Sequence, residues 1–328
     1  MNEIVEFDAR VQASLAEASR RDQNPAIVYV ATLQSKLSRE TTKRKLSAVI
    51  KAFDGELSKA TIETFPWRGV RYQHVAAFMS RLVDLDYAPA TSNSLRATLR
   101  GVMRQAWLLG AITAEEHERI KSVGPAKGSR PLAGREVEVQ DLASISESID
   151  SERVIGIRDT AMLALMHVTG MRRSEIASVR IESYNASSGS MLVRGKGNKT
   201  RTVFVGTAKQ ALDAWVTARG TVPGPLFLAA HKSGKLLGHG IVASTIFRTI
   251  RRRCESASVS PFSPHDLRRT FVSGQLAAGT DLVTVQHMAG HSDPSTTAKY
   301  DRRGDSAARS AAMKVHTPFC SPDAPKPG

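Results

Sequence analysis

The sequence is short of cysteine, of long hydrophobic runs and of internal repeats, and each shortage excludes a class of protein. Its two cysteines, Cys254 and Cys320, stand far apart, so they form neither a disulfide framework nor a zinc-binding cluster. No stretch approaches the roughly 18 uninterrupted apolar residues that a membrane-spanning helix needs. The N-terminus lacks the basic head and apolar core of a secretory signal. We therefore expect a cytoplasmic protein.

Positive charge is what the sequence has in excess. Lys plus Arg number 46 against 31 for Asp plus Glu, which gives a net charge of +15 and a pI of about 10.1. Residues 1–123 carry 18 basic and 14 acidic residues, and the remaining residues carry 28 and 17. Because the excess runs through segments with apolar periodicity, it favours a folded surface for a polyanion over a basic tail.

Residues 1–123 predict a small all-helical domain. Apolar residues recur at helical spacing, and we expect helices over residues 5–20, 25–37, 40–53, 72–84, 91–109 and 113–123. In the helix over 91–109, Leu95 and Leu99 begin an apolar stripe, and Arg96, Arg100 and Arg104 form a basic stripe beside it. The first domain therefore has both a core face and a candidate surface for phosphates.

Residues 124–136 predict a linker, because their first eleven positions hold three glycines and two prolines with little periodicity. A mixed domain follows over residues 137–316, and residues 317–328 form a Pro-rich tail that we expect to be disordered. The strands 189–193 and 201–205 flank a turn-rich segment and predict a hairpin. The helices of this domain are expected over 139–147, 155–168, 174–179 with Ser174 as N-cap, 207–217, 240–254, from Ser263-Pro264 onward, from Asp281 to Gly290, and from Pro294 or Ser295 to Tyr300.

Reactive polar side chains gather in four short segments where loops or helix starts would expose them. These are Thr169–Arg172, Gly195–Gly197, His265–Arg268, and Gly290–Ser292 with Tyr300 following. The set lacks the carboxylate cluster that would hold Mg²⁺ or Zn²⁺. Arginine pairs suit a phosphate, because each planar guanidinium donates two parallel hydrogen bonds to its oxygens. A tyrosine nucleophile beside such a pair suggests phosphoryl transfer to a phenol oxygen.

These motifs resemble the tyrosine recombinase family, the phage-integrase-like enzymes of the Xer, integrase and transposon or plasmid type. The family motifs are an arginine, a lysine, His-x-x-Arg, a histidine within Gly-His, and a tyrosine; they fall here on Arg172, Lys196, His265, Arg268, His291 and Tyr300. Residues 290–300, which read GHSDPSTTAKY, follow the family pattern almost throughout. The resemblance implies a mostly α fold with a small β-sheet. It consists of an N-terminal helical core-binding (SAM-like) domain and an α+β catalytic domain.

The resemblance also implies a mechanism that uses no cofactor. Tyr300 would attack the scissile phosphate of duplex DNA, become a 3′-phosphotyrosine and free a 5′-hydroxyl. Arg172 and Arg268 would clamp the non-bridging oxygens, and Lys196 would protonate the leaving 5′-oxygen. The phosphodiester energy stays in the protein linkage, so rejoining needs neither ATP nor a metal.

The two histidines have supporting parts in this implied mechanism. His265 would assist proton removal from Tyr300 or hydrogen-bond the phosphate, and His291 would donate to a non-bridging oxygen. Full strand exchange joins two duplexes, so the family assembles as a homotetramer on DNA. An accessory recombinase or a DNA-bending protein is a further expected partner, and no membrane is.

Basic residues outside the motifs are candidates for DNA contact. They are Lys43, Arg44 and Lys45 at the start of one helix, the stripe Arg96, Arg100 and Arg104, and Arg173, Lys199 and Arg201 in the second domain. The run Arg248 to Arg253 is equally consistent with phosphate contact and with a solvated helix end. From the sequence, two other functions stay open: a type IB-like topoisomerase with the same nucleophile, and a non-catalytic DNA-binding protein.

Overall fold

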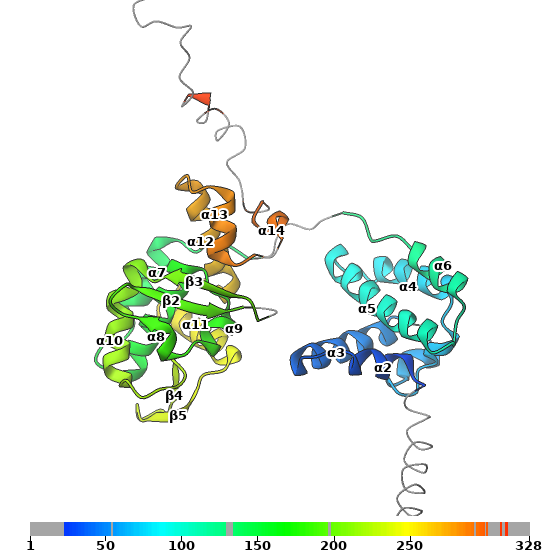
Figure 1. The fold of residues 1–328 in the computed structure, drawn as a ribbon, viewed down its shortest axis with the longest axis horizontal. Helices are drawn as coiled ribbons and strands as arrows, with labels where there is room; N and C mark the ends of the chain where they lie inside the picture. The colour runs from blue at the N-terminus through cyan, green and yellow to red at the C-terminus, as the bar shows by residue number, and fades with distance from the viewer. Residues whose placement is uncertain are drawn as a thin grey trace, which may run out of the picture. The chain divides into compact units, whose positions relative to one another are not determined.

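The chain divides into two compact units, each with a buried core of its own. The structure is a computed structural model that describes residues 23–53, 55–128, 134–195, 198–291, 293–298, 300, 309, 312 and 313. Contacts separate Met1–Ala133 from Gly134–Gly328 (Figure 1). The helix expected over residues 5–20, the tip of the 195–197 turn and the tail 317–328 lie outside the described residues.

The described part of the first unit is helical, as expected from its apolar periodicity. Its helices are α2 (Pro25–Ala31), α3 (Lys36–Lys51), α4 (Tyr72–Asp84), α5 (Pro89–Leu108) and α6 (Ala114–Ser122), with the 3-10 turns η1 (Gly55–Lys59) and η2 (Trp67–Gly69). The bounds expected for the helices over 25–37 and 40–53 are wrong. Ser35 accepts a hydrogen bond from the Ser38 N–H at 3.0 Å and starts α3 there, so Leu37 belongs to the second of the two.

Helix α5 carries the core of this unit. Leu95, Leu99, Val102 and Ala106 are buried on one face, which confirms the apolar stripe. This face packs against α2 and α3. At Gly101 the backbone meets the ring of Tyr29, and a Cβ there would lie 2.4 Å from the tyrosine Cζ. The glycine at this crossing of α2 and α5 thus leaves room for the Tyr29 ring, which a larger residue would displace.

The second unit is mixed α and β. Its helices are α7 (Val139–Glu147), α8 (Val154–Thr169), α9 (Arg173–Ser178), α10 (Lys209–Arg219), α11 (Ala243–Ser256), α12 (Pro264–Ala277), α13 (Leu282–Ala289) and α14 (Pro294–Ala298), with the 3-10 turns η3 (Ile181–Ser183) and η5 (Gly206–Ala208). Its strands are β1 (Tyr184–Asn185), β2 (Ser190–Arg194), β3 (Thr200–Phe204), β4 (Leu228–Ala230) and β5 (Leu236–Gly240). Among the described helices, none is long and apolar enough to cross a membrane.

The sheets are small and antiparallel. Strands β2 and β3 pair with Val193 opposite Arg201, which confirms the expected hairpin, and β1 adds to its β2 edge. Met191, Val193 and Val203 point into the core, while Leu192 faces solvent. Neither β1 nor the β4–β5 hairpin was expected, because their strands are short and β5 contains two glycines.

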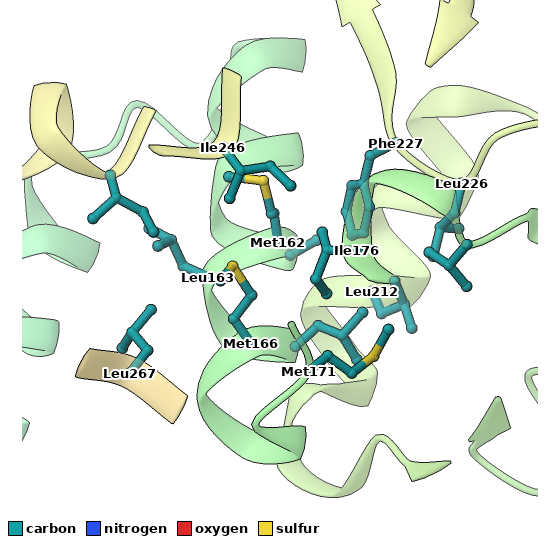
Figure 2. Close-up of a cluster of buried hydrophobic side chains, with 14 of the residues drawn as sticks. Met162, Leu163, Met166, Met171, Ile176, Leu212, Leu226, Phe227, Ile246 and Leu267 are labelled. Atoms are coloured by element: carbon teal, nitrogen blue, oxygen red, sulfur yellow. The ribbon is translucent and has the colours of Figure 1, made fainter. Parts of the chain in front are cut away.

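Helix α8 runs through the centre of the second unit's core. Met162, Leu163 and Met166 of this helix belong to one buried cluster with Ile176, Leu212, Phe227, Ile246 and other apolar side chains (Figure 2). The helix ends at Gly170, whose φ of +59° is the left-handed conformation that glycine adopts at helix ends. A Cβ on Gly170 would lie 2.3 Å from Cδ1 of Phe271, so α12 approaches this end of α8 closely.

A buried carboxylate ties α8 to α11. Asp159 is fully buried and accepts hydrogen bonds from Arg158, Arg252 and Arg253. Arg252 keeps a side-chain exposure of 55 %, and Arg253 keeps 14 %. At Arg252 and Arg253, the end of α11 is therefore held by ion pairs with Asp159.

Both ends of the expected linker are fastened to the units. Ala126 donates its N–H to Oδ1 of Asn93 on α5 at 2.9 Å, and Asn93 donates back to the Ala126 carbonyl at 3.1 Å. On the other side, the Val137 N–H donates to Oγ1 of Thr270 on α12 at 2.8 Å. Residues 124–128 therefore pack with the first unit, and residues 134–136 belong to the second.

Candidate active site

Five of the six motif residues lie at the ends of four helices in the second unit. Arg172 precedes α9, His265 and Arg268 lie in the first two turns of α12, His291 follows α13, and Tyr300 follows α14. Figure 1 shows α12 and α13 side by side in this unit. Lys196 lies outside the described residues, in the part of the sequence between β2 and β3.

The start of α12 is built by local rules that the sequence already showed. Ser263 is the N-cap, Pro264 occupies the first helical position, and Asp266 bonds back to the Ser263 N–H at 2.8 Å. This cap fixes the first turn. It places His265 where solvent reaches it and buries Arg268 one turn later.

Arg268 is a buried cation with an unused donor. Its Nη1 donates to the Gly170 carbonyl at 2.7 Å, whereas Nη2 is buried and has no partner among the described residues. Burial, and next the positive field of Arg172, lower its pKa to about 10, so it remains charged at neutral pH. A buried guanidinium nitrogen without an acceptor is costly, and an anion would satisfy it.

Glu175 holds the other motif arginine. It is 3 % exposed, and its two carboxylate oxygens accept from the Arg172 N–H and from Arg172 Nη1, each at 2.9 Å. The expectation of Ser174 as N-cap is wrong, because Arg172 holds that position and Glu175 satisfies its N–H. Burial alone would raise the pKa of Glu175, but hydrogen bonds from Arg201 and from the Arg172 backbone keep it below its ordinary value.

The structure gives Arg201 a place other than the DNA surface expected from the sequence. Its Nη1 and Nη2 each donate to Glu175 at 2.9 Å, and its Nε donates to the Met288 carbonyl at 3.2 Å. Its side chain is 14 % exposed. Arg201 thus forms a two-pronged ion pair, because a buried carboxylate lies within reach of β3; its contact with DNA stays a prediction.

The chain turns sharply at Gly290, between α13 and His291. Gly290 has a φ of +66°, and its carbonyl accepts from Arg172 Nη2 at 2.7 Å. A Cβ on Gly290 would lie 2.8 Å from Arg201 Nη1. The expected cap at Asp281 is present as well, so both ends of α13 follow the sequence signals.

Tyr300 and His265 face each other. The Tyr300 hydroxyl lies 3.4 Å from Nε2 of His265, and Tyr300 is 8 % exposed. Partial burial, and then Arg268 and Arg269, lower the pKa of His265, so its ring is neutral near pH 7. A neutral ring nitrogen is able to accept a proton from the phenol.

His291 completes the cluster. Its ring lies 6.4 Å from the Tyr300 ring, centroid to centroid, at an interplanar angle of 16°. Its Nδ1 is 2.8 Å from Oγ1 of Thr297. Burial, followed by Arg268 and Arg172, lowers its pKa to about 4, so this histidine too is neutral at pH 7.

The arrangement is chemically an anion site beside a phenol. Two guanidiniums supply charge, two neutral imidazoles supply hydrogen-bonding groups, and the tyrosine oxygen lies next to one of them. In the described part of the chain, no group of three or more His, Cys, Asp or Glu side chains is placed to hold a metal ion. Sequence reasoning missed Glu175 and Thr297. Glu175 stands three residues after an N-cap, the position where an acidic side chain bonds back to the cap, and that signal could have found it.

The other candidate DNA contacts fall into two groups by exposure. Lys43, Arg44, Arg104, Arg173 and Lys199 are exposed, and Lys45 and Arg100 are partly exposed. Arg100 and Arg104 line a cavity of about 570 Å³ together with His117 and Lys121 of α6. Arg96 differs from its two stripe partners, because its guanidinium donates to the Val123 carbonyl through Nε at 2.8 Å and also through Nη2.

Comparison with known proteins gives the family of the chain. The sequence model of the phage integrase family matches residues 135–306, more than half of the chain. The chain belongs to this family, that of the tyrosine recombinases. The mostly helical fold with small antiparallel sheets matches the fold of this family.

Curated relatives and a solved structure extend the comparison. The tyrosine recombinase XerD of Staphylococcus saprophyticus is 32 % identical over 188 residues, which are 55 % of this chain and 62 % of that protein, less than two thirds of its length. XerC of Stutzerimonas stutzeri is 28 % identical over 85 % of this chain and 91 % of its own. A lambda integrase dimer bound to a COC′ core site is similar in fold, with a TM-score of 0.63 and 18 % identity over 88 % of this chain and 96 % of that one.

Proposed function

We propose that this protein is a site-specific recombinase that cuts and rejoins duplex DNA through a 3′-phosphotyrosine intermediate. One observation carries the proposal. Within the described part of the chain, the buried Nη2 of Arg268 has no acceptor, and the same cluster holds a tyrosine hydroxyl 3.4 Å from a neutral histidine. A backbone phosphate would satisfy the arginine and present its phosphorus to the phenol. The names of the relatives, tyrosine recombinases XerC and XerD, support the same conclusion.

The reaction transfers a phosphoryl group from the 5′-oxygen of DNA to the tyrosine oxygen. The Tyr300 oxygen forms a bond to phosphorus, the bond from phosphorus to the 5′-oxygen breaks, and His265 receives the phenol proton. Arg172 and Arg268 hold the non-bridging oxygens, where negative charge accumulates in the transition state. His291 donates to one of those oxygens. Rejoining is the reverse reaction with a 5′-hydroxyl of another strand, so no ATP is consumed.

The leaving 5′-oxygen needs a proton, and we assign its donor to Lys196. The assignment rests on the sequence: the lysine stands between two glycines at the turn of the β2–β3 hairpin, and the family has a lysine at this point. General acid catalysis of this kind contributes about 10²- to 10⁴-fold. The charge in this proposed site comes from arginine and lysine, so the proposed reaction uses no metal and no other cofactor.

The proposed substrate fits the charge of the chain. A net charge of +15 attracts a polyanion, and binding to phosphates weakens as salt rises. We propose that the exposed candidates Lys43, Arg44 and Lys199 and the neighbours Arg100 and Arg104 contact the DNA backbone. Exchange between two duplexes requires four strand cuts, which favours a homotetramer on DNA. We place this activity in the cytoplasm.

The central test is covalent capture on DNA. A nicked suicide substrate that carries the target site releases a short fragment after cleavage, so the protein stays attached to the 3′ end. We expect the unaltered protein to form this adduct with EDTA present, and Tyr300→Phe to bind the same DNA without forming it. Sequencing of the attached ends would identify the cut position. An unaltered protein that binds DNA and never forms an adduct is a binding protein only, and the proposal fails.

A second assay separates the recombinase from the topoisomerase. Both enzymes use a tyrosine nucleophile, so the adduct alone does not distinguish them. A supercoiled plasmid with two copies of the captured site should yield exchanged products that differ in restriction pattern. Relaxation of the plasmid without exchange would favour the type IB-like alternative, which the relatives' names do not favour.

A further inference from the structure

Thr297 joins the histidine and the nucleophile of the proposed site. Its Oγ1 lies 2.8 Å from Nδ1 of His291, and its carbonyl accepts the Tyr300 N–H at 3.0 Å. Thr297 is fully buried. The His291 backbone is held separately by Gln286, whose carbonyl accepts the His291 N–H at 3.1 Å and whose side-chain amide donates to the His291 carbonyl at 3.2 Å. One threonine in α14 therefore contacts both reacting residues.

The direction of the bond between threonine and histidine follows from a count of donors. A threonine hydroxyl has one hydrogen to donate, and a buried hydrogen without an acceptor is unfavourable. Among the described residues, Nδ1 of His291 is the only hydrogen-bond partner of the Thr297 hydroxyl. The hydroxyl therefore donates to Nδ1, which must carry a lone pair. A neutral imidazole holds one proton, so that proton is on Nε2.

We propose that Thr297 selects the tautomer of His291 in which Nε2 carries the proton, and so prepares the ring to donate to a phosphate oxygen. This inference rests on the proposed function, because it assigns His291 the role of a neutral donor. Thr297 itself is a positioning residue, which acts on the phosphate through the histidine. In the other tautomer, Nε2 would turn a lone pair toward an oxygen anion and repel it.

The surroundings of His291 make the tautomer matter more than the charge. Arg268, Arg172, His265 and Arg201 all act on the ring and oppose its protonation. Partial burial opposes it further, and the ring therefore stays neutral through the physiological range. A histidinium would donate from both nitrogens whatever its neighbour did, but a neutral ring needs a partner at Nδ1 to fix its donor at Nε2.

The decisive experiment reads the tautomer directly in the DNA-free protein. Nitrogen-15 NMR of the histidine side chains distinguishes a protonated Nε2 from a protonated Nδ1, and the spectrum of His291→Gln assigns the signal. We expect His291 to be Nε2-protonated at pH 7 in the unaltered protein and in Thr297→Ser. In Thr297→Val, which has a similar shape and no hydroxyl, we expect a mixture of both tautomers. A protonated Nδ1 in the unaltered protein would overturn the inference.

Adduct formation on the suicide substrate gives a second readout. We expect Thr297→Val to slow it by about two- to tenfold at unchanged DNA affinity, since only the fraction of rings that keep the proton on Nε2 can donate to the phosphate. Thr297→Ser should recover most of the rate. The matched control is Thr296→Val, the same change at the preceding threonine, which is not fully buried; we expect its rate to match that of the unaltered protein.

The two proposals fail in different ways. An unaltered protein that forms no adduct rejects the proposed function, whereas the NMR result still reports the tautomer. Adduct formation at the full rate in a folded Thr297→Val, as judged by its thermal unfolding, rejects the positioning role. If Thr297→Val does not fold, the spectrum of the unaltered protein still decides whether Nε2 holds the proton.

Discussion

The second unit holds two buried carboxylates that are surrounded by arginines, and they serve different ends. Asp159 is shared by Arg158, Arg252 and Arg253, and no buried nitrogen of these arginines lacks a partner within the described residues. Glu175 binds Arg172 and Arg201 in a similar way. Beside Glu175, however, the buried Nη2 of Arg268 has no acceptor among the residues that the structure describes. The saturated cluster holds helices together, whereas the cluster with an unused donor can still bind an anion.

Helix α8 connects the two clusters. Asp159 lies in its first half, and Gly170, which accepts from Arg268, ends it. At 1.5 Å per residue, about 15 Å of helix separates Asp159 from this end. The Asp159 cluster therefore fixes the helix whose far end positions the candidate site.

The largest effect is expected from breaking the saturated cluster. Asp159→Asn keeps the shape of the side chain but leaves three guanidiniums without their counter-charge. We expect the free energy of unfolding to fall by about 3–5 kcal/mol, the usual result when one partner of a buried ion pair is removed. Urea unfolding followed by circular dichroism measures it. The control is Arg252→Ala, for which we expect about 0–1 kcal/mol because that side chain is 55 % exposed; equal effects of the two changes would contradict this account.

The next effect falls on the unsaturated cluster and on rate rather than stability. Arg268→Ala removes the donor that we assign to the phosphate, and the loss of one such donor costs about 10²–10³ in rate. We expect adduct formation to slow by this factor, and the DNA affinity of the second unit to change little. Single-turnover cleavage of the suicide substrate measures it. Arg173→Ala, an exposed arginine next to the motif arginine, is the control, and a comparable slowing there would mean that charge alone is responsible.

A smaller effect is expected from Arg201, which serves Glu175 from β3. Arg201→Met keeps the length of the side chain and removes three hydrogen bonds, two to Glu175 and one to Met288. Hydrogen bonds to charged groups contribute about 1.5–3 kcal/mol, and we expect both stability and cleavage rate to fall because Arg172 loses its fixed partner. Arg201→Lys should recover part of the rate. If Arg201→Met lowered DNA affinity and left stability and rate unchanged, the result would contradict this role for Arg201 and support the phosphate contact predicted from the sequence.

The last effect, which is small near neutral pH, is a pH dependence of stability that comes from the unsaturated cluster. The pKa of His291 is lowered to about 4 in the folded protein, and that of His265 is lowered as well. Between the folded-state pKa of His291 and the ordinary histidine pKa of about 6.5, the unfolded chain binds more protons, so stability decreases as pH falls through this range. Urea unfolding at several pH values measures the slope. His291→Gln should make it shallower, and an unchanged slope would contradict the assignment.

The comparison also shows which parts of the molecule a sequence can predict. The caps at Ser263-Pro264 and Asp281, the turn at Gly290 and the apolar face of α5 follow from neighbouring residues, and the structure contains all of them. The six motif residues could be named because each lies in a short pattern. The β4–β5 hairpin was missed because its strands are short and lack alternation.

Pairings between distant segments were beyond such reasoning. The sequence predicted a surface position for Arg201, because no residue near it in the chain indicates a pairing with Glu175, which stands 26 positions earlier. Arg253 and Asp159 are 94 positions apart. The energy of these contacts comes from burial, and burial is set by the whole fold rather than by the local pattern.

Arg172 reaches across 118 positions of the chain to the carbonyl of Gly290, and that span has a consequence for the cell. A polypeptide still emerging from the ribosome holds the first arginine long before the tyrosine has been made. The proposed active site is therefore complete only when synthesis and folding of the second unit are nearly finished. A partly synthesised copy therefore lacks the proposed nucleophile, Tyr300.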